Sequence, residues 1–145
     1  MAIQFARARY IARSSGGSAV RSAAYNARDA ITAERTGELY YFKHRDAPAH
    51  HDVLLPEGAD ARFAASVVLW NAAEAAEKRM DAQVAREIVL ALPADQDISN
   101  EDRIALAHSF AAQHFVAKGL AVQLDVHAPH EGSEESERRT GTRIC

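Results

Sequence analysis

A tyrosine near the start of this sequence lies where its phenol could act as a nucleophile. Tyr25 follows a serine- and glycine-rich turn on an expected helix, with Arg21 four residues before it and Arg28 three residues after it. A phenol attacks well only when its proton is removed or its oxyanion is stabilised, and nearby guanidinium groups favour the phenolate. The pattern suits reversible phosphoryl transfer. The alternative is a tyrosine whose ring packs on a sheet.

Two further side chains stand at strand positions where chemistry is possible. Glu87 lies in the apolar run 86–92, where a carboxylate either faces solvent or points at a functional centre and serves as a base. His127 ends the apolar strand expected over 120–127, a suitable place for an imidazole metal ligand. A divalent ion needs at least two more ligands, and His130 follows in a loop from which its direction cannot be read. The alternative for His127 is a capping histidine.

The charge distribution adds a possible partner. Residues 1–45 carry eight Lys and Arg against three acids, a balance of +5, although the 145-residue chain has a net charge of −3. Such a basic segment attracts a phosphate backbone, and Arg13, Arg21 and Arg28 are the expected contacts. The alternative is a solvated basic surface.

The elements that must position these residues follow from periodicity and turn signals. We expect strands over 3–11, 38–43, 83–92 and 120–127, and helices over 18–29, 60–80 and 99–118. The segment 44–58 is expected to be mostly loop, with a short apolar piece at 53–55. The order indicates an α+β fold, a layered sheet with the helices packed on one face.

Composition excludes several classes of protein. Cys145 is the only cysteine, so a disulfide framework and a cysteine-based zinc site are both excluded, and a reducing cytoplasm is expected. No apolar run is long enough for a transmembrane helix, and the N-terminus lacks the pattern of a secretory signal. The length fits one domain or part of one.

Three segments, in this order and at these spacings, resemble the MobA/MobL family of conjugative relaxases, and the TraA type most closely. They are Ile11–Tyr25, Arg86–Pro93 and Val122–His127. The Ser/Gly turn followed by an alanine-rich helix that carries a tyrosine is the specific signal, and the other two segments are weak singly. The resemblance runs from about residue 1 to residue 137.

The resemblance implies a fold, an activity and partners. The fold would be of the HUH endonuclease type, an antiparallel sheet with helices packed on it. Tyr25 matches the nucleophile that attacks a phosphodiester at a plasmid origin of transfer and stays linked to the 5′ phosphate. His127 matches the first of three histidines that hold a divalent metal, Mg or Mn, and Glu87 matches an acid of the family motif. Partners would be single-stranded plasmid DNA and other relaxosome proteins, in the cytoplasm and away from membranes.

The end of the chain departs from the family pattern. The family continues into a segment resembling Ala-Asn-Trp-His-Ala-His-Leu, which supplies the second and third metal histidines, whereas this chain ends in Arg-Thr-Gly-Thr-Arg-Ile-Cys. Loss of one base from codons for the family segment would give this tail. We therefore expect a partial relaxase domain over 1–130, followed by a disordered, frameshifted tail over 131–145, and a sheet that lacks its usual next strand. TraA-type relatives carry a helicase domain further along.

Three functions remain open at this point. The first is a relaxase fragment whose nicking activity is low or absent because the metal site is incomplete. The second is a non-catalytic remnant that binds DNA through its basic first third. The third is a pseudogene product without function.

Overall fold

One antiparallel sheet organises the molecule. The computed structural model describes residues 5–92, 98–127 and 140–144. Within these ranges the sheet has five strands in the order β1-β5-β7-β6-β4, and every neighbouring pair is antiparallel. The strands are β1 (Phe5–Ala12), β4 (His50–Leu54), β5 (Gln83–Leu92), β6 (Val122–Val126) and β7 (Thr140–Ile144). A separate two-stranded ribbon consists of β2 (Ala30–Thr32) and β3 (Leu39–Tyr41).

Within the described ranges three α-helices pack on this sheet, and two of them begin at a serine cap. The helices are α1 (Ala19–Ala27), α2 (Ser66–Ala76) and α3 (Asn100–His114). Ser18 accepts a hydrogen bond from the Arg21 amide at the start of α1, and Ser99 accepts one from the Asp102 amide at the start of α3. These side chains satisfy amide groups that have no partner within the first turn of a helix.

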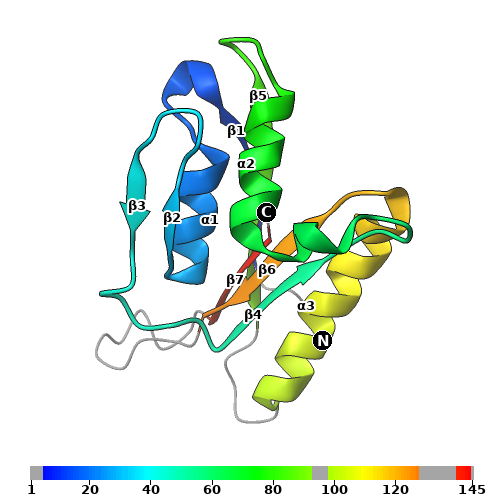
Figure 1. Ribbon diagram of the computed structural model, residues 1–145. Coiled ribbons are helices and arrows are strands. Elements are labelled where there is room, and N and C mark those ends of the chain that lie inside the picture. The colour runs from blue at the N-terminus through cyan, green and yellow to red at the C-terminus, as the bar shows by residue number, and fades with distance from the viewer. Residues whose placement is uncertain (1–4, 93–97, 128–139, 145) are drawn as a thin grey trace.

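The helices cover both faces of the sheet (Figure 1). On β6, Gln123 points toward α1, where its amide donates to the carbonyl of Ala23. The neighbouring Leu124 packs in a second core with Ala107 and Ala111 of α3. Because successive side chains of a strand point to opposite faces, α1 and α3 lie on opposite sides of the sheet. The expectation that all helices share one face is therefore wrong, although the α+β class is confirmed.

The tail differs from its expected disorder at residues 140–144. These residues form β7, which lies between β5 and β6 in the middle of the sheet (Figure 1). A short segment with little apolar character has no reason to form a strand alone, but here two flanking strands supply partners for its backbone. The prediction of a disordered tail, and of a sheet lacking this strand, is wrong for 140–144. Residues 131–139 lie outside the described part of the chain.

Two other elements differ from their expected form. The helix predicted over 60–80 is divided, because Ala65 adopts an extended conformation between the 3-10 turn Ala61–Ala64 and α2. The helix α2 buries Trp70, Asn71 and Glu74, while Val67 is 45% exposed. In the segment expected to be loop, His50–Leu54 forms β4 and pairs with β6.

Candidate functional site

The turn before α1 requires a glycine at position 17. A Cβ atom on Gly17 would lie 2.6 Å from the carbonyl oxygen of Ala12, closer than side-chain carbons approach an oxygen. The Gly17 amide donates to that same oxygen at 2.9 Å. The backbone therefore folds tightly onto the end of β1 before Ser18 starts the helix. This close approach fixes where α1, and with it Tyr25, leaves the sheet.

A buried ion pair anchors the same turn. Glu74 of α2 accepts the amide of Ala19 at 2.7 Å through one oxygen and the guanidinium of Arg13 at 2.9 Å through the other. Arg13 also donates to the carbonyls of Glu77 and Arg79. The side chains of Arg13 and Glu74 are only 6% and 5% exposed. The guanidinium of Arg13 is thus buried and holds α2 against the start of α1, and the expected contact of Arg13 with DNA stays a prediction.

Tyr25 lies at the surface end of α1, half-buried among aromatic and cationic side chains. Its ring makes an edge-on contact with Phe42, with 5.3 Å between ring centroids. The guanidinium carbons of Arg28 and Arg45 lie 4.3 and 5.2 Å from the centre of the Tyr25 ring. Cation–π contacts of this kind hold an aromatic ring while leaving cationic groups near its hydroxyl.

Tyr25 and Glu87 line the same pocket, of about 190 Å³. The remaining lining residues are Arg9, Arg21, Ser22 and Phe42. Glu87 comes from β5 and is 2% exposed, so neighbouring side chains solvate its carboxylate in place of bulk water. It accepts hydrogen bonds from Arg9 at 2.8 Å and from Asn26 at 3.0 Å. The pocket thus combines a phenol, an oriented carboxylate and two guanidinium groups.

Two of the three predicted DNA-contacting arginines lie beside this tyrosine. Arg21 is exposed and lines the pocket. The sequence spacing predicted that Arg28 lies within the helix, but α1 ends at Ala27. Arg28 caps the helix in a left-handed conformation with φ 55°, and its side chain folds back to donate to the Tyr25 carbonyl at 2.8 Å. Arg28 therefore reaches Tyr25 because the chain reverses there and not because the two share a helix face.

Sequence reasoning missed both residues that hold the Glu87 carboxylate, Asn26 and Arg9. Asn26 follows Tyr25 directly, but its burial against Glu87 depends on a contact across 61 residues of sequence. Arg9 was counted only as part of a basic segment, although it pairs with Glu87 across the β1–β5 register. A signal for Arg9 existed: an arginine in the first strand and a glutamate in an apolar strand form a plausible cross-strand pair.

A row of buried polar side chains leads along β6 toward His127. Trp70 donates to Gln123 at 2.6 Å, and Gln123 donates to Asp125 at 2.6 Å. Asp125 in turn contacts Nδ1 of His51 on β4 at 2.5 Å. Because side chains alternate along a strand, half-buried His127 continues this row on the same face. These hydrogen bonds hold β6 in place just before His127, the predicted metal ligand.

The described residues do not complete a metal site around His127. Among residues 5–92, 98–127 and 140–144, no group of three His, Cys, Asp or Glu side chains could hold a metal ion. His51, the imidazole nearest to this row, is already engaged with Asp125. His130 lies outside the described residues. The described residues therefore supply no complete set of donors for a divalent metal, and the predicted metal centre remains a prediction.

The His51–Asp125 pair predicts a pH-dependent stability. The hydrogen bond to Asp125 is the main cause that raises the pKa of His51 above its ordinary 6.5, and partial burial opposes it. A histidine whose pKa is raised on folding stabilises the protein below pH 6.5, and this contribution is lost as pH rises through the higher, folded pKa. His51→Gln should therefore flatten the decline in the free energy of unfolding as the pH rises above 6.5. Urea unfolding measures it, with exposed His108→Gln as the control, and an unchanged slope in His51→Gln contradicts the prediction.

Among the described residues, no helix is both long and apolar enough to cross a bilayer.

Known proteins resemble this chain along most of its length. A family model described as the MobA/MobL family matches residues 17–138. The chain is 39% identical over 129 residues to the mobilization protein MobL of Acidithiobacillus ferridurans, covering 89% of the chain and 33% of that relative. It is 34% identical over 137 residues to the conjugal transfer protein TraA of Agrobacterium fabrum, covering 88% of the chain and 12% of that relative. The chain thus spans a third or less of the length of these relatives.

A solved structure has the same fold. It is described as "Molecular Basis of Vancomycin Resistance Transfer in Staphylococcus aureus", and it aligns with 99% of this chain and 70% of its own length. The TM-score is 0.85 at 26% sequence identity. The pairing of a Ser/Gly turn, a tyrosine-bearing helix and a buried strand glutamate thus occurs on a fold shared with a solved relative. On the family match over residues 17–138, this chain belongs to the MobA/MobL family of mobilization proteins and relaxases.

Proposed function

We propose that this chain carries the nucleophile-bearing part of a relaxase domain that cuts and rejoins single-stranded DNA at a plasmid origin of transfer. The observation that supports it most is the shared pocket of Tyr25 and Glu87, edged by Arg9 and Arg21. Relatives named for mobilization and conjugal transfer supply the biological setting. The proposed partners are the DNA strand and other proteins of the relaxosome, in the cytoplasm.

The proposed reaction exchanges one phosphate ester for another. The Tyr25 oxygen attacks the scissile phosphorus and forms a P–O bond, while the bond from phosphorus to the 3′ oxygen breaks. The 5′ phosphate stays on the tyrosine, and the departing 3′ oxygen takes up a proton. The 3′ hydroxyl can later attack the phosphotyrosine and restore the strand, because the two esters are of similar energy.

Glu87 is the proposed acceptor for the phenol proton. A buried carboxylate held by Arg9 and Asn26 has a fixed direction, and it lines the same pocket as Tyr25. A positioned general base typically contributes about 10²- to 10⁴-fold to a rate. The neighbouring arginines would in turn attract the scissile phosphate and stabilise negative charge on the phenol oxygen.

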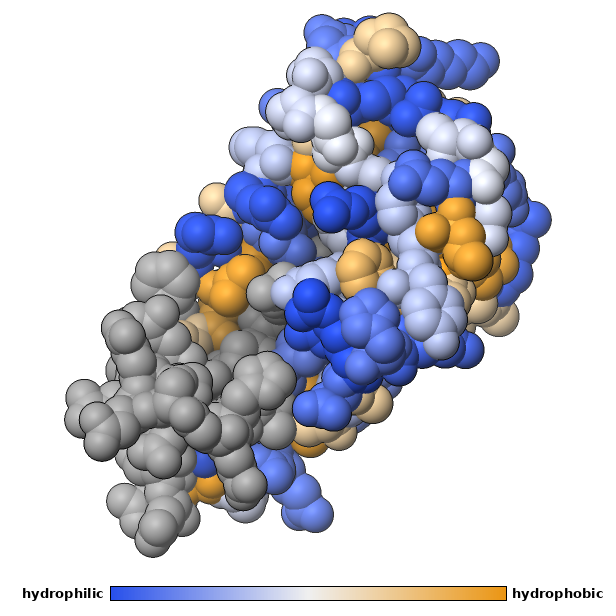
Figure 2. Space-filling model, turned by 90° about the vertical axis from the view of Figure 1, so that its left-hand side faces the viewer, coloured by the Kyte–Doolittle hydropathy of each residue, from blue (hydrophilic) through white to orange (hydrophobic). Residues whose placement is uncertain are grey.

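The face of the molecule that carries the β2–β3 ribbon is mainly hydrophilic. Figure 2 faces the side of the molecule on which the β2–β3 ribbon lies in Figure 1, and hydrophilic side chains dominate there, with small separate apolar areas. Phosphate groups bind such surfaces through Lys and Arg, and this term falls as salt rises. A divalent metal, Mg or Mn, remains part of the proposal through family resemblance alone, and no step above depends on it.

The proposal is tested by trapping the covalent intermediate. A 5′- or 3′-labelled single-stranded oligonucleotide spanning the transfer origin is incubated with the protein and Mg or Mn, then separated in denaturing detergent. Label from the 3′ side of the cut should migrate with the protein, whereas the 5′ side is released as a shorter free strand. Absence of any adduct at every origin sequence carried by the plasmid would contradict catalysis by this chain.

A second candidate function is DNA binding without cleavage. It is favoured by the donor set around His127, which within the described residues falls short of three metal ligands. It shares the DNA-contacting arginines with the first proposal, so binding alone does not separate the two. Salt-dependent binding to origin DNA together with no adduct identifies this second function.

Arg21→Ala is expected to weaken DNA binding through loss of one phosphate contact. Arg21 is exposed beside Tyr25, so its removal should lower affinity for single-stranded DNA several-fold and reduce the salt slope by about 0.7. Arg62→Ala, which removes an exposed arginine paired with Asp60 on another element, is the matched control. Fluorescence anisotropy over a salt series measures both. An equal loss of DNA affinity in the two variants would show that only the total positive charge matters. It would contradict a binding site for DNA beside Tyr25.

A further inference from the structure

The strand β1 carries two arginines at alternate positions, and one of them already belongs to the pocket of Tyr25. Arg9 stands opposite Glu87 in the register with β5 and donates to its carboxylate through Nε at 2.8 Å. Arg7 stands two residues along the same strand, opposite Val89. Because successive side chains of a strand point to opposite faces, Arg7 and Arg9 share the face on which this pocket lies. Arg7 is therefore one strand repeat, about 7 Å, beyond the pocket.

Neither arginine has its positive charge fully compensated. The Arg9 side chain is 54% exposed and its bond to Glu87 engages Nε, so further N–H donors of the guanidinium can meet a second anion. Arg7 is exposed, and within the part of the chain that the structure describes no carboxylate forms an ion pair with it. An exposed arginine elsewhere, Arg62, has Asp60 as its partner. The exposed edge of the pocket along β1 therefore attracts anions.

The spacing of the two arginines suits the backbone of a nucleic acid. Neighbouring phosphates of one DNA strand are joined by the same number of backbone bonds as residues i and i+2 of a peptide chain. The two repeats therefore have similar lengths when both chains are extended, and β1 is extended from Phe5 to Ala12. A guanidinium can also bind two oxygens of one phosphate in parallel, which fixes the position of that phosphate.

We propose that Arg7 and Arg9 bind two neighbouring phosphates of the DNA strand, and that Arg7 forms a second phosphate subsite next to the scissile position. This inference rests on the proposed function, because it takes Tyr25 as the point at which the strand is cut. Arg9 lines the pocket and takes the scissile phosphate, and Arg7 takes the adjacent one. The strand then runs along β1, held by its backbone and independently of its base sequence.

The position of Arg7 outside the pocket predicts how it contributes to the reaction. Its phosphate does not react, so the contact is the same before the cut and in the transition state. Such uniform binding lowers the substrate concentration that the protein needs and does not change the rate at saturation. Arg7→Gln should therefore raise the DNA concentration for half-maximal adduct formation several-fold and leave the rate at saturating DNA unchanged.

The test couples one phosphate of the strand to one arginine of the protein. Single-stranded origin oligonucleotides, each with one neutral methylphosphonate in place of a phosphate, are titrated with the 145-residue protein and followed by fluorescence anisotropy. Arg7→Gln should weaken binding of the unmodified strand several-fold and reduce the salt slope by about 0.7. It should cause no further loss on the strand modified next to the scissile position, because that contact is then already missing.

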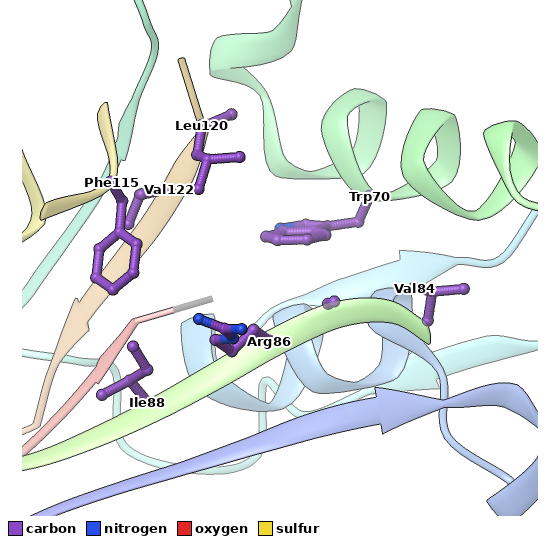
Figure 3. Close-up of a pocket in the computed structure, with 9 residues that line it drawn as sticks. Trp70, Val84, Arg86, Ile88, Phe115, Leu120 and Val122 are labelled. Atoms are coloured by element: carbon purple, nitrogen blue, oxygen red, sulfur yellow. The ribbon is translucent and has the colours of Figure 1, made fainter. Parts of the chain in front are cut away.

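Arg86→Gln is the matched control, because Arg86 is an exposed arginine of the neighbouring strand on the opposite face of the sheet. It stands opposite Tyr10 in the register, and its guanidinium donates to the Tyr10 hydroxyl at 2.5 Å. Figure 3 shows Arg86 and Ile88 on β5 with β1 beside it, and both line a pocket with Phe115 of the α3-side core. Arg86→Gln should bind every strand as the parental protein does. Arg7→Lys keeps the charge without the planar fork and should recover part of the affinity.

The outcomes separate the subsite from the proposed cleavage. Equal losses in Arg7→Gln and Arg86→Gln, or no loss in Arg7→Gln, would overturn the subsite. Coupling only at phosphates distant from the mapped cut would overturn it as well. Adduct formation by the parental protein without any coupling would leave the proposed nicking in place and remove the subsite alone. Coupling at one phosphate without any adduct would support the subsite and contradict cleavage.

Discussion

Tyr25→Phe is expected to abolish the covalent protein–DNA adduct while leaving the fold and DNA binding unchanged. The substitution removes only the hydroxyl, so the edge contact with Phe42 and the stacking of Arg28 on the ring remain. Phenylalanine at position 25 has no oxygen that could form the ester with the 5′ phosphate, so the covalent adduct cannot form there. Denaturing gels with labelled origin DNA measure the adduct, and circular dichroism checks the fold.

Tyr41→Phe provides the matched control for this loss. Tyr41 is 55% exposed on β3 and does not line the pocket of Tyr25 and Glu87, so the adduct should form at the parental rate. Adduct formation that persists in Tyr25→Phe would refute the assignment of the nucleophile. Loss in both variants would point to a general effect of removing a tyrosine hydroxyl on DNA binding, which anisotropy measurements would reveal.

Elements with strong periodicity were predictable from the sequence. The strand expected over 83–92 is β5 with the same bounds, because its apolar run is stopped by Pro93 and packs on both faces. The helix carrying Tyr25 was also foreseen, since Ser18 caps it and alanines favour it. The sequence predicts a helix or strand correctly when the residues that determine it, such as a cap or an apolar run, lie within that element.

Elements defined by their partners were not predictable. β4 contains His50, His51 and Asp52, a polar run that reads as loop, and it becomes a strand because β6 pairs with it. β2 has only three residues and depends on pairing with β3, which follows after the connection 33–38. β7 has a weak strand pattern and is held by two neighbours distant in sequence. In each case tertiary context overrides local preference.

The site was foreseen in part, and the failures have a physical cause. Tyr25 and Glu87 were paired through family resemblance, and the structure places both at one pocket. Arg13 was grouped with surface arginines because a count of charges contains no information on burial. Its partner Glu74 is 61 residues away, and only the packing of α2 against the start of α1 brings them together. The frameshift suggested for the tail remains a prediction, and sequencing of the gene tests it.

Glu74→Gln is expected to destabilise the protein by about 3 kcal/mol or more, the second large effect predicted here. Glutamine keeps the shape of the side chain and an oxygen for the Ala19 amide. It removes the negative charge, however, and leaves the guanidinium of Arg13, only 6% exposed, without its counter-ion in the interior. Breaking a buried pair from one side costs far more than losing a surface pair, because the remaining charge is desolvated without compensation. Urea unfolding measures the difference.

Glu77→Gln is the control, because Glu77 is exposed and contributes only its backbone carbonyl to Arg13. It should change the free energy of unfolding by less than about 0.5 kcal/mol. The double variant Arg13→Met with Glu74→Leu should recover part of the stability lost in Glu74→Gln, since it removes both buried charges together. A Glu74→Gln protein as stable as Glu77→Gln would show that the pair does not anchor the turn. The position of Tyr25 would then depend on Gly17 and Ser18 alone.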